Sequence, residues 1–353
     1  MIERLLKGAI KMWSKQERMK AVMSGEPADR PPVTAYRHFP GCEEDPVLSA
    51  KAMVEFQRKY DWDWVKVNPS AVYYYEPWGN KYDYAHYQGT VPTRLDYGIH
   101  TVEDLEKVVP HSGLYGSFGT QVHALRLIRE ALGPDCPIYQ SIFTPIAILL
   151  NICGGRSPGR YREAPRDACP LLPLFREHKE LVHRALKNIT ETLADYAAQC
   201  LKNGADGMFF AEMGLAREGY LTLEEWKEFI EPYDRAILEV IAPHPCALHT
   251  CGIYGNPERF VEYHYPITAL HWAESAPGNP PIAGSEKWLN GIAAMGGVDE
   301  RLFGTRAVEK IRTMAANSVA ANKNRPFLLA PECTVAASTT EEEYMALKSA
   351  SHD

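Results

Sequence analysis

The sequence predicts an α/β protein built as a (β/α)₈ barrel, and three observations support this fold class. The chain has 353 residues, enough for a single barrel or for two ordinary domains. Short apolar runs alternate along it with longer amphipathic segments, which is typical of a parallel sheet covered by helices. Eight such runs can be counted, and eight strands close a barrel. A doubly wound open sheet is the alternative with the same alternation.

The eight apolar runs are short enough to be strands and are predicted to be buried on both sides. They cover residues 33–37, 63–68, 137–143, 206–212, 246–251, 268–274, 292–299 and 327–333.

Three of the segments between these runs carry clear helical patterns. Residues 180–204 have apolar side chains at helical spacing and end at Gly204, a suitable C-cap. Residues 222–242 open with a threonine that is followed three residues later by a glutamate, the pattern of a capping box. Residues 305–320 show a further helical pattern.

Two connections are unusually long and are expected to form inserted lid segments after the second and third strands. Residues 69–136 are rich in tyrosine, and residues 150–173 are rich in proline, glycine and arginine. Both follow the carboxyl ends of strands, where barrel enzymes build their sites. The tyrosines of 73–75 could stack on an aromatic substrate or pack a small subdomain. We expect one domain over 1–353, with residues 1–30 as a helical extension.

Composition and charge exclude several functional classes. The formal net charge of −7 argues against a nucleic-acid surface. No run of 18 apolar residues predicts a membrane span, and the first residues lack a cleavable signal pattern. The eight cysteines are scattered rather than arranged in a dense framework, which indicates a reducing compartment. A cytoplasmic protein is therefore expected.

The stretch 246-CALHTCG-252 delivers two candidate metal ligands at the end of the fifth predicted strand. Residues two apart on a strand share a face, so His249 and Cys251 can both point inward. Cys333 ends the eighth strand and would reach the same barrel mouth. Two thiolates and an imidazole favour zinc, and three protein ligands with an open position are typical of catalytic zinc. The alternative is that these cysteines are ordinary core residues.

Six segments in order resemble the uroporphyrinogen decarboxylase superfamily over essentially the whole chain. This resemblance independently implies a (β/α)₈ barrel. The segments are 17-ERMKAVMSGEPADRPPV-33, 141-SIFTPIAILLNICGG-155, 203-NGADGMFFAE-212, 221-LTLEEWKEFIEPY-233, 249-HTCG-252 and 296-GGVD-299.

The resemblance is to the zinc-dependent, corrinoid-linked methyltransferase branch rather than to the decarboxylase proper. The decarboxylase has an arginine-rich segment after the first strand and an aspartate after the second. Here 35-AYRHFPG-41 keeps only Arg37, and 67-VNPSAVYYYE-76 has no aspartate. The methyltransferase branch carries H-x-C followed by a distant cysteine, matched by 249-HTC-251 and 330-APEC-333. Glu332 stands where that branch usually has glycine.

The resemblance also implies roles for residues around the metal. An acidic residue after the sixth strand can be a fourth zinc ligand, and Glu274, His271 or neither would fill this place. Glu212 and Glu274 are candidates for catalytic groups acting as a general acid. The residues assigned to substrate binding are Arg37, His38, Asn68, Gln140, His271 and Asp299.

The expected function is transfer of a methyl group between a small substrate and a corrinoid protein. The substrate would be a thiol, or a methoxylated or methylated compound. No D-x-H-x-x-G pattern is present, so the corrinoid would come on a separate protein that docks at the barrel mouth. The alternatives are a metal-independent decarboxylase that binds carboxylates with the arginines of 150–173, and zinc-dependent thiol alkylation without corrinoid. The resemblance allows a homodimer.

Overall fold

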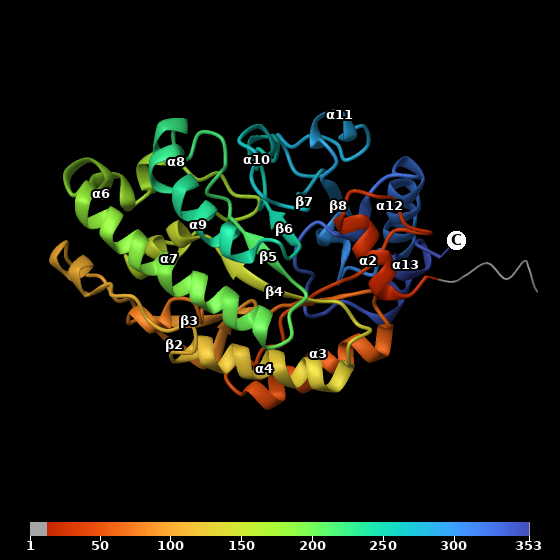
Figure 1. Cartoon of the computed structure of the whole chain (residues 1–353), viewed down its shortest axis with the longest axis horizontal. Coiled ribbons are helices and arrows are strands. Elements are labelled where there is room, and N and C mark those ends of the chain that lie inside the picture. The colour runs from red at the N-terminus through yellow and green to blue at the C-terminus, as the bar shows by residue number, and fades with distance from the viewer. Residues whose placement is uncertain (1–12, 353) are drawn as a thin grey trace, which may run out of the picture.

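The protein, described from residue 13 to residue 352 by a computed structural model, is organised around a curled parallel sheet (Figure 1). The sheet has seven strands in the order β1-β4-β5-β6-β7-β8-β9, and every neighbouring pair is parallel. These strands are β1 (Val65–Val67), β4 (Ile138–Phe143), β5 (Gly207–Ala211), β6 (Cys246–His249), β7 (Ala269–His271), β8 (Ala293–Val298) and β9 (Phe327–Pro331).

Seven of the eight predicted strands are therefore present, and the first one differs. Residues 33–37 contribute a single parallel bridge between Val33 and Leu329 of β9. On its other side the Val33 carbonyl accepts a hydrogen bond from the Asp63 backbone, just before β1. Two prolines precede Val33 and have no N–H to donate, so the ladder cannot extend from Val33 toward the N-terminus. The segment lies between the two edge strands without becoming a regular strand.

Helices cover the outer face of the sheet, with α3 and α4 along one side and α7 and α9 along the next (Figure 1). The α-helices are α2 (Lys15–Met23), α3 (Pro46–Tyr60), α4 (Ser117–Leu132), α5 (Pro145–Ile152), α6 (Leu171–Glu177), α7 (Lys179–Lys202), α8 (Leu223–Phe229), α9 (Glu231–Ile241), α10 (Glu258–Glu262), α11 (Glu286–Leu289), α12 (Val308–Ala321) and α13 (Glu341–Ser349). Short 3₁₀ helices are η2 (Glu76–Trp78), η3 (Glu103–Lys107), η4 (Arg166–Ala168) and η5 (Glu300–Leu302).

The three predicted helical segments correspond to α7, to α8 with α9, and to α12. The Thr222 hydroxyl accepts from the Glu225 backbone while the Glu225 carboxylate accepts from the Thr222 backbone, so the expected capping box is present. The single helix predicted over 222–242 is divided at Ile230, because Pro232 in the first turn of α9 cannot continue the ladder of α8.

Strand alternation divides the buried side chains into two layers. Between sheet and helices lies a large core that includes Val65, Val67 and Leu248. Inside the curl lies a second core, to which Phe209 and Ala247 belong. A side chain of the inner layer can therefore reach the space inside the curled sheet at the carboxyl ends of the strands. The residues directly before and after it on the strand point toward the helices instead.

The two long connections carry their own structure. Residues 69–136 contain η2, the antiparallel hairpin of β2 (Lys81–Gln88) and β3 (Val91–Asp96), η3 and α4. Residues 150–173 contain the end of α5, η4 and the start of α6. The three tyrosines of 73–75 are all buried, and the Tyr73 hydroxyl is 2.8 Å from that of Tyr196 on α7. They pack against α7 and β4, in agreement with the subdomain interpretation.

Part of the predicted N-terminal extension, residues 1–12, lies outside the described residues. The described part forms α2, which begins with a capping box between Ser14 and Glu17. Among the helices of residues 13–352, none is long and apolar enough to cross a membrane.

Candidate metal centre

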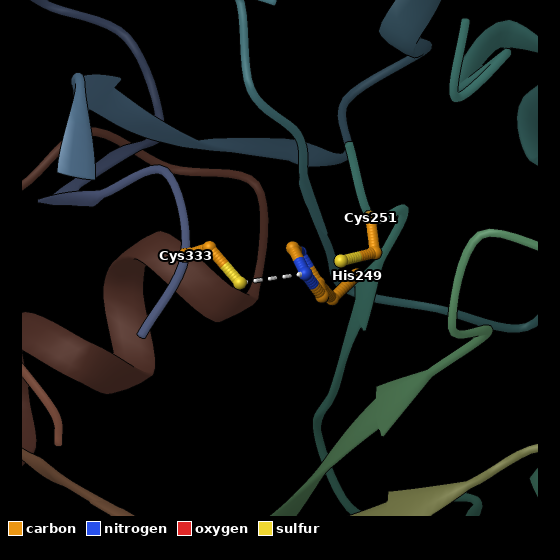
Figure 2. A group of neighbouring side chains, drawn as sticks. All are labelled: His249, Cys251 and Cys333. Carbon is orange, nitrogen blue, oxygen red and sulfur yellow. Dashed lines mark hydrogen bonds between the residues drawn. The ribbon is translucent and has the colours of Figure 1, made fainter. Parts of the chain in front are cut away.

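The three predicted metal ligands lie together at the carboxyl ends of two strands that are distant in sequence. His249 is the last residue of β6, Cys251 lies two residues beyond it, and Cys333 follows β9. Their ligand atoms all lie within 4.8 Å of one another. The Cys333 Sγ is 3.6 Å from the His249 Nε2, and Figure 2 shows the Cys333 side chain pointing toward the imidazole, with the Cys251 sulfur drawn on the other side of the ring.

This donor set fits zinc in composition and in spacing. Zinc bonds of about 2.0–2.3 Å to nitrogen and sulfur place tetrahedral donors roughly 3.5 Å apart. The distance of 3.6 Å between Cys333 Sγ and His249 Nε2 is close to that value. Soft thiolates with one imidazole select zinc over hard cations. Three donors that face one cavity leave a position open for a reactant.

The Glu212 carboxylate binds the backbone of the loop that carries Cys251. Its Oε1 accepts hydrogen bonds from the backbone of Gly214 at 2.7 Å and of Cys251 at 3.1 Å, and its Oε2 accepts from Ala216 at 2.5 Å. The side chain is 1% exposed, and burial raises the pKa of its carboxyl. Glu212 therefore orients the backbone that carries Cys251, and both of its oxygens are already engaged.

The backbone of Arg160 packs against the same loop at Gly252. A β-carbon at Gly252, where φ is +81°, would lie 2.2 Å from the Arg160 carbonyl oxygen, so only glycine allows this approach. The Arg160 guanidinium donates to the Thr334 carbonyl at 3.0 Å and pairs with Glu300 at 3.3 Å. These contacts place a positive charge next to Cys333.

The two thiols and their neighbours favour a thiolate at this position. Hydrogen bonding to Cys251, aided by Arg160 and His249, lowers the pKa of Cys333 well below its usual range although burial opposes the shift. Thiolate is the form that binds metal, so Cys333 is the sulfur of the pair that is ready to bind a cation, whereas the hydrogen bond with Cys333 and burial raise the pKa of Cys251.

The three ligands form part of the wall of a cavity of about 200 Å³ at the carboxyl ends of the strands. Most of the remaining wall is apolar and includes Tyr36, Tyr74, Phe143 and Phe209. The Tyr74 ring stacks on Phe143 with centroids 4.2 Å apart and an interplanar angle of 25°. The cavity thus joins the metal ligands to a flat aromatic surface.

Two of the predicted substrate-binding residues, His38 and Asn68, line this cavity. His38 Nδ1 is 3.4 Å from the carboxylate of Glu43, and both residues are buried. Asn68 Oδ1 accepts a hydrogen bond from the Lys66 ammonium at 2.5 Å.

Lys66 is a cavity residue that the sequence interpretation missed. It is 8% exposed, and its Nζ lies 4.4 Å from the Tyr36 ring centroid and 4.5 Å from that of Phe209. Burial lowers the pKa of Lys66 to about 7. The sequence does contain an indication of this position. Lys66 lies inside the apolar run 63-DWVKVN-68, two residues before Asn68, so both side chains face the same side of the strand.

Arg37 and Gln140 do not line this cavity. Arg37 donates to the His38 carbonyl at 3.2 Å, and its guanidinium stands over the Phe39 ring. Gln140 is fully buried and pairs in register with Val67, which belongs to the outer core. Alternation along β4 therefore turns Gln140 towards the helices.

His271 lies beside the metal ligands without joining them. Its ring centroid is 4.6 Å from that of His249, but its Nε2 is 3.1 Å from the Pro331 carbonyl. A carbonyl only accepts, so Nε2 carries the proton. Burial, followed by the charge of His249, lowers the pKa of His271 well below its usual value and keeps the ring neutral.

The predicted acidic residues after β7 and β8 also lie outside the cavity wall. The Glu274 carboxylate accepts from the Ile282 backbone at 2.8 Å, and Asp299 pairs with Arg301 at 2.8 Å. Glu332, next to Cys333, turns to the Ser275 hydroxyl and backbone. Burial raises the pKa of Glu332 to about 8. These groups fix the loops around the centre.

Comparison with known proteins identifies the family. The family described as uroporphyrinogen decarboxylase (URO-D) matches residues 14–353. The uroporphyrinogen decarboxylase of Prochlorococcus marinus (strain NATL1A) is 24% identical over 65% of the chain and 60% of its own length. The methylcobamide:CoM methyltransferase MtbA of Methanosarcina mazei is 23% identical over 46% of the chain and 44% of its own length. The chain thus spans well under two thirds of these curated relatives.

A solved structure of a methyltransferase from Methanosarcina mazei superposes with a TM-score of 0.78 at 19% identity, covering 97% of this chain and 99% of that one. This similarity shows a shared fold. The relatives carry the names of both a decarboxylase and a methyltransferase, so the choice between these activities depends on the site.

Proposed function

The chain belongs to the uroporphyrinogen decarboxylase family, and we propose that it is a zinc-dependent methyltransferase of that family. In this proposal it moves a methyl group between a small substrate and a corrinoid carried by a separate protein. The observation that carries the proposal is the convergence of His249, Cys251 and Cys333 on one cavity. The similarity to MtbA and the shared fold of a methyltransferase support it.

In this proposal His249, Cys251 and Cys333 would hold the zinc. Zinc bound there would act as a Lewis acid that stabilises a thiolate or polarises a leaving oxygen or sulfur. Arg160 would stabilise the negative charge that gathers on the two ligand thiolates. Glu212 would hold the Cys251 backbone, and so acts by positioning rather than by proton transfer.

The apolar wall of the cavity would exclude water from the reacting atoms. The mouth of the cavity would admit the reactive group of a corrinoid protein, as the sequence prediction requires. A homodimer and a cytoplasmic location stay predictions of the sequence, as do the lid roles of 69–136 and 150–173.

A second candidate is a metal-independent decarboxylase, which the names of several relatives favour. Its arginines would come from the 150–173 connection. Arg166 is already paired with Glu225, and Arg160 with Glu300. Of these arginines, only Arg160 lies on the wall of the cavity. The contacts of the arginines therefore favour the methyltransferase.

Metal content and methyl transfer test the proposal together. We expect purified protein to hold about one zinc per chain, and Cys251→Ser and Cys333→Ser to lose it. Transfer from methylcobalamin to a thiol, followed by the absorbance change of the cobalamin, should disappear in the same variants. Cys42→Ser, at a cysteine that does not line the cavity, is the matched control and should keep both. Wild-type protein without zinc, or zinc retained by both variants, would contradict the proposal.

A further inference from the structure

The wall of the cavity formed by β1 carries a buried lysine, Lys66, that the metal proposal does not use. Lys66 extends from the middle of β1 into the inner layer, and its ammonium lies over the rings of Tyr36 and Phe209. Its one hydrogen bond within the described residues goes to Asn68 Oδ1 at 2.5 Å. An ammonium has three donors, so two remain for another partner.

Asn68 is held in the orientation that serves Lys66. The ammonium can only donate, so the amide must present its oxygen to it. The Nδ2 of Asn68 is then buried without a partner among the described residues. Leaving a buried donor unpaired destabilises the fold, so this arrangement is kept at a cost in stability. Asn68 is therefore a positioning residue for the Lys66 ammonium.

The described cavity wall supplies no carboxylate for this ammonium, and the Cys333 thiolate that acts on Lys66 would be engaged by zinc in the proposed function. Among the described residues that line the cavity, none is an aspartate or a glutamate. The second fixed cation on the wall, Arg160, already has Glu300 as its partner. A buried charge normally has a counterion, and the aromatic rings only partly replace one. An anionic group of a ligand would complete the site.

The shape of the rest of the cavity limits the size and character of that ligand. About 200 Å³ is below the ~300–1,000 Å³ of pockets that hold drug-sized molecules. The stacked pair of Tyr74 and Phe143 gives a flat apolar wall. A small molecule with an apolar or aromatic body and a single charged end matches these features.

We propose that Lys66, positioned by Asn68, is the binding site for the carboxylate of the substrate, which is a small monocarboxylic acid with an apolar or aromatic body. A bound carboxylate would accept hydrogen bonds from the two free N–H groups of the ammonium. The body of the acid would lie along Tyr74 and Phe143, with its methylated or methyl-accepting atom towards Cys333. The inference rests on the proposed function only in taking this cavity as the substrate site.

Binding of benzoate and of its neutral analogue benzamide tests the carboxylate site without any turnover. In calorimetric titrations of the full chain, Lys66→Met should weaken benzoate by about 10- to 100-fold, the effect of one charge-assisted hydrogen bond and its charge. Benzamide should bind wild type and variant equally. Lys310→Met, an exposed lysine on α12, is the matched control and should bind both as wild type does. Thermal unfolding of each variant would show that it is folded.

Two outcomes separate this inference from the proposed function. Equal benzoate affinity in wild type and Lys66→Met, or no benzoate binding by wild type, would overturn the carboxylate site while leaving zinc content and methyl transfer as they are. Benzoate binding that depends on Lys66 in a protein without zinc would support the carboxylate site and overturn the methyltransferase.

Discussion

Two walls of the cavity carry chemistry of different kinds, and the sequence encodes them in different ways. The wall at the ends of β6 and β9 offers two thiols and an imidazole, and a spacing pattern in the sequence predicts it. The wall at β1 offers an ammonium on two aromatic rings, with no motif around it. The comparison teaches that residues which would bind one metal ion leave a spacing pattern in the sequence. A single buried lysine leaves no such pattern, and its role can be inferred only from the residues around it in the structure.

The largest expected effect comes from removing one ligand on the thiol wall. Cys333→Ser replaces a soft donor with a hydroxyl that binds zinc poorly, and Arg160 loses the thiolate beside it. We expect methyl transfer to fall by more than about 100-fold, beyond the 10–100-fold typical of changes in groups that only support metal ligands. Initial rates with zinc-supplemented protein measure this.

The same variant should leave the β1 wall intact. Benzoate affinity of Cys333→Ser should not fall below that of wild type, because the direct Lys66 contacts involve other residues and loss of the Cys333 thiolate removes a competing anion. A large loss of benzoate binding in this variant would mean that the two walls do not act separately.

The second prediction concerns the loop that carries Cys251. Gly252→Ala would place a β-carbon 2.2 Å from the Arg160 carbonyl oxygen at a φ of +81°. We expect a loss of unfolding free energy of about 1–3 kcal/mol together with weaker zinc binding, since the loop must move. Urea denaturation and metal titration measure the two effects. Gly219→Ala, also at positive φ but with no atom near its β-carbon, controls for backbone strain alone.

The parallel strands and the meeting of His249 and Cys251 on one face could be predicted from the sequence because both are local patterns with distinct periods. Apolar runs locate strands, and the alternation of β6 puts His249 and Cys251 on one face. Cys333 required one further assumption, that strands of a parallel sheet end at the same edge. The helix boundaries at α7 and α12 were also within a few residues of the predicted ones.

Roles that depend on the direction of a side chain could not be predicted. Glu212 and Glu274 are close in sequence to strand ends, but both carboxylates bind backbone N–H groups of loops. Gln140 was assigned to the site although the register of β4 turns it outward. Lys66 is the reverse case, because it faces the cavity although the prediction from the sequence did not include it. A lysine inside an apolar run looks like an error in strand assignment rather than a functional group.

A third, smaller effect should follow from changing Glu212 to glutamine. The carboxylate accepts three backbone hydrogen bonds, and an amide must present its NH₂ to at least one of these donors. Because Cys251 is one of the three, Glu212→Gln should weaken zinc by about 10-fold, as expected for groups that orient ligands. Competition with a chromogenic chelator measures it. Glu274→Gln changes a carboxylate outside the cavity wall and should leave zinc affinity unaltered.

The smallest effect concerns the β1 wall and is a gain in unfolding free energy rather than a loss. Lys66→Met replaces a buried ammonium that lacks a counterion with an apolar side chain of similar length, so unfolding free energy should rise by about 1 kcal/mol while benzoate binding weakens. Saturating benzoate stabilises whichever protein binds it, so it should narrow this difference or reverse it in urea denaturation. A variant that is less stable than wild type both with and without benzoate would show instead that Lys66 serves the fold, because a group kept for a ligand costs stability until that ligand arrives.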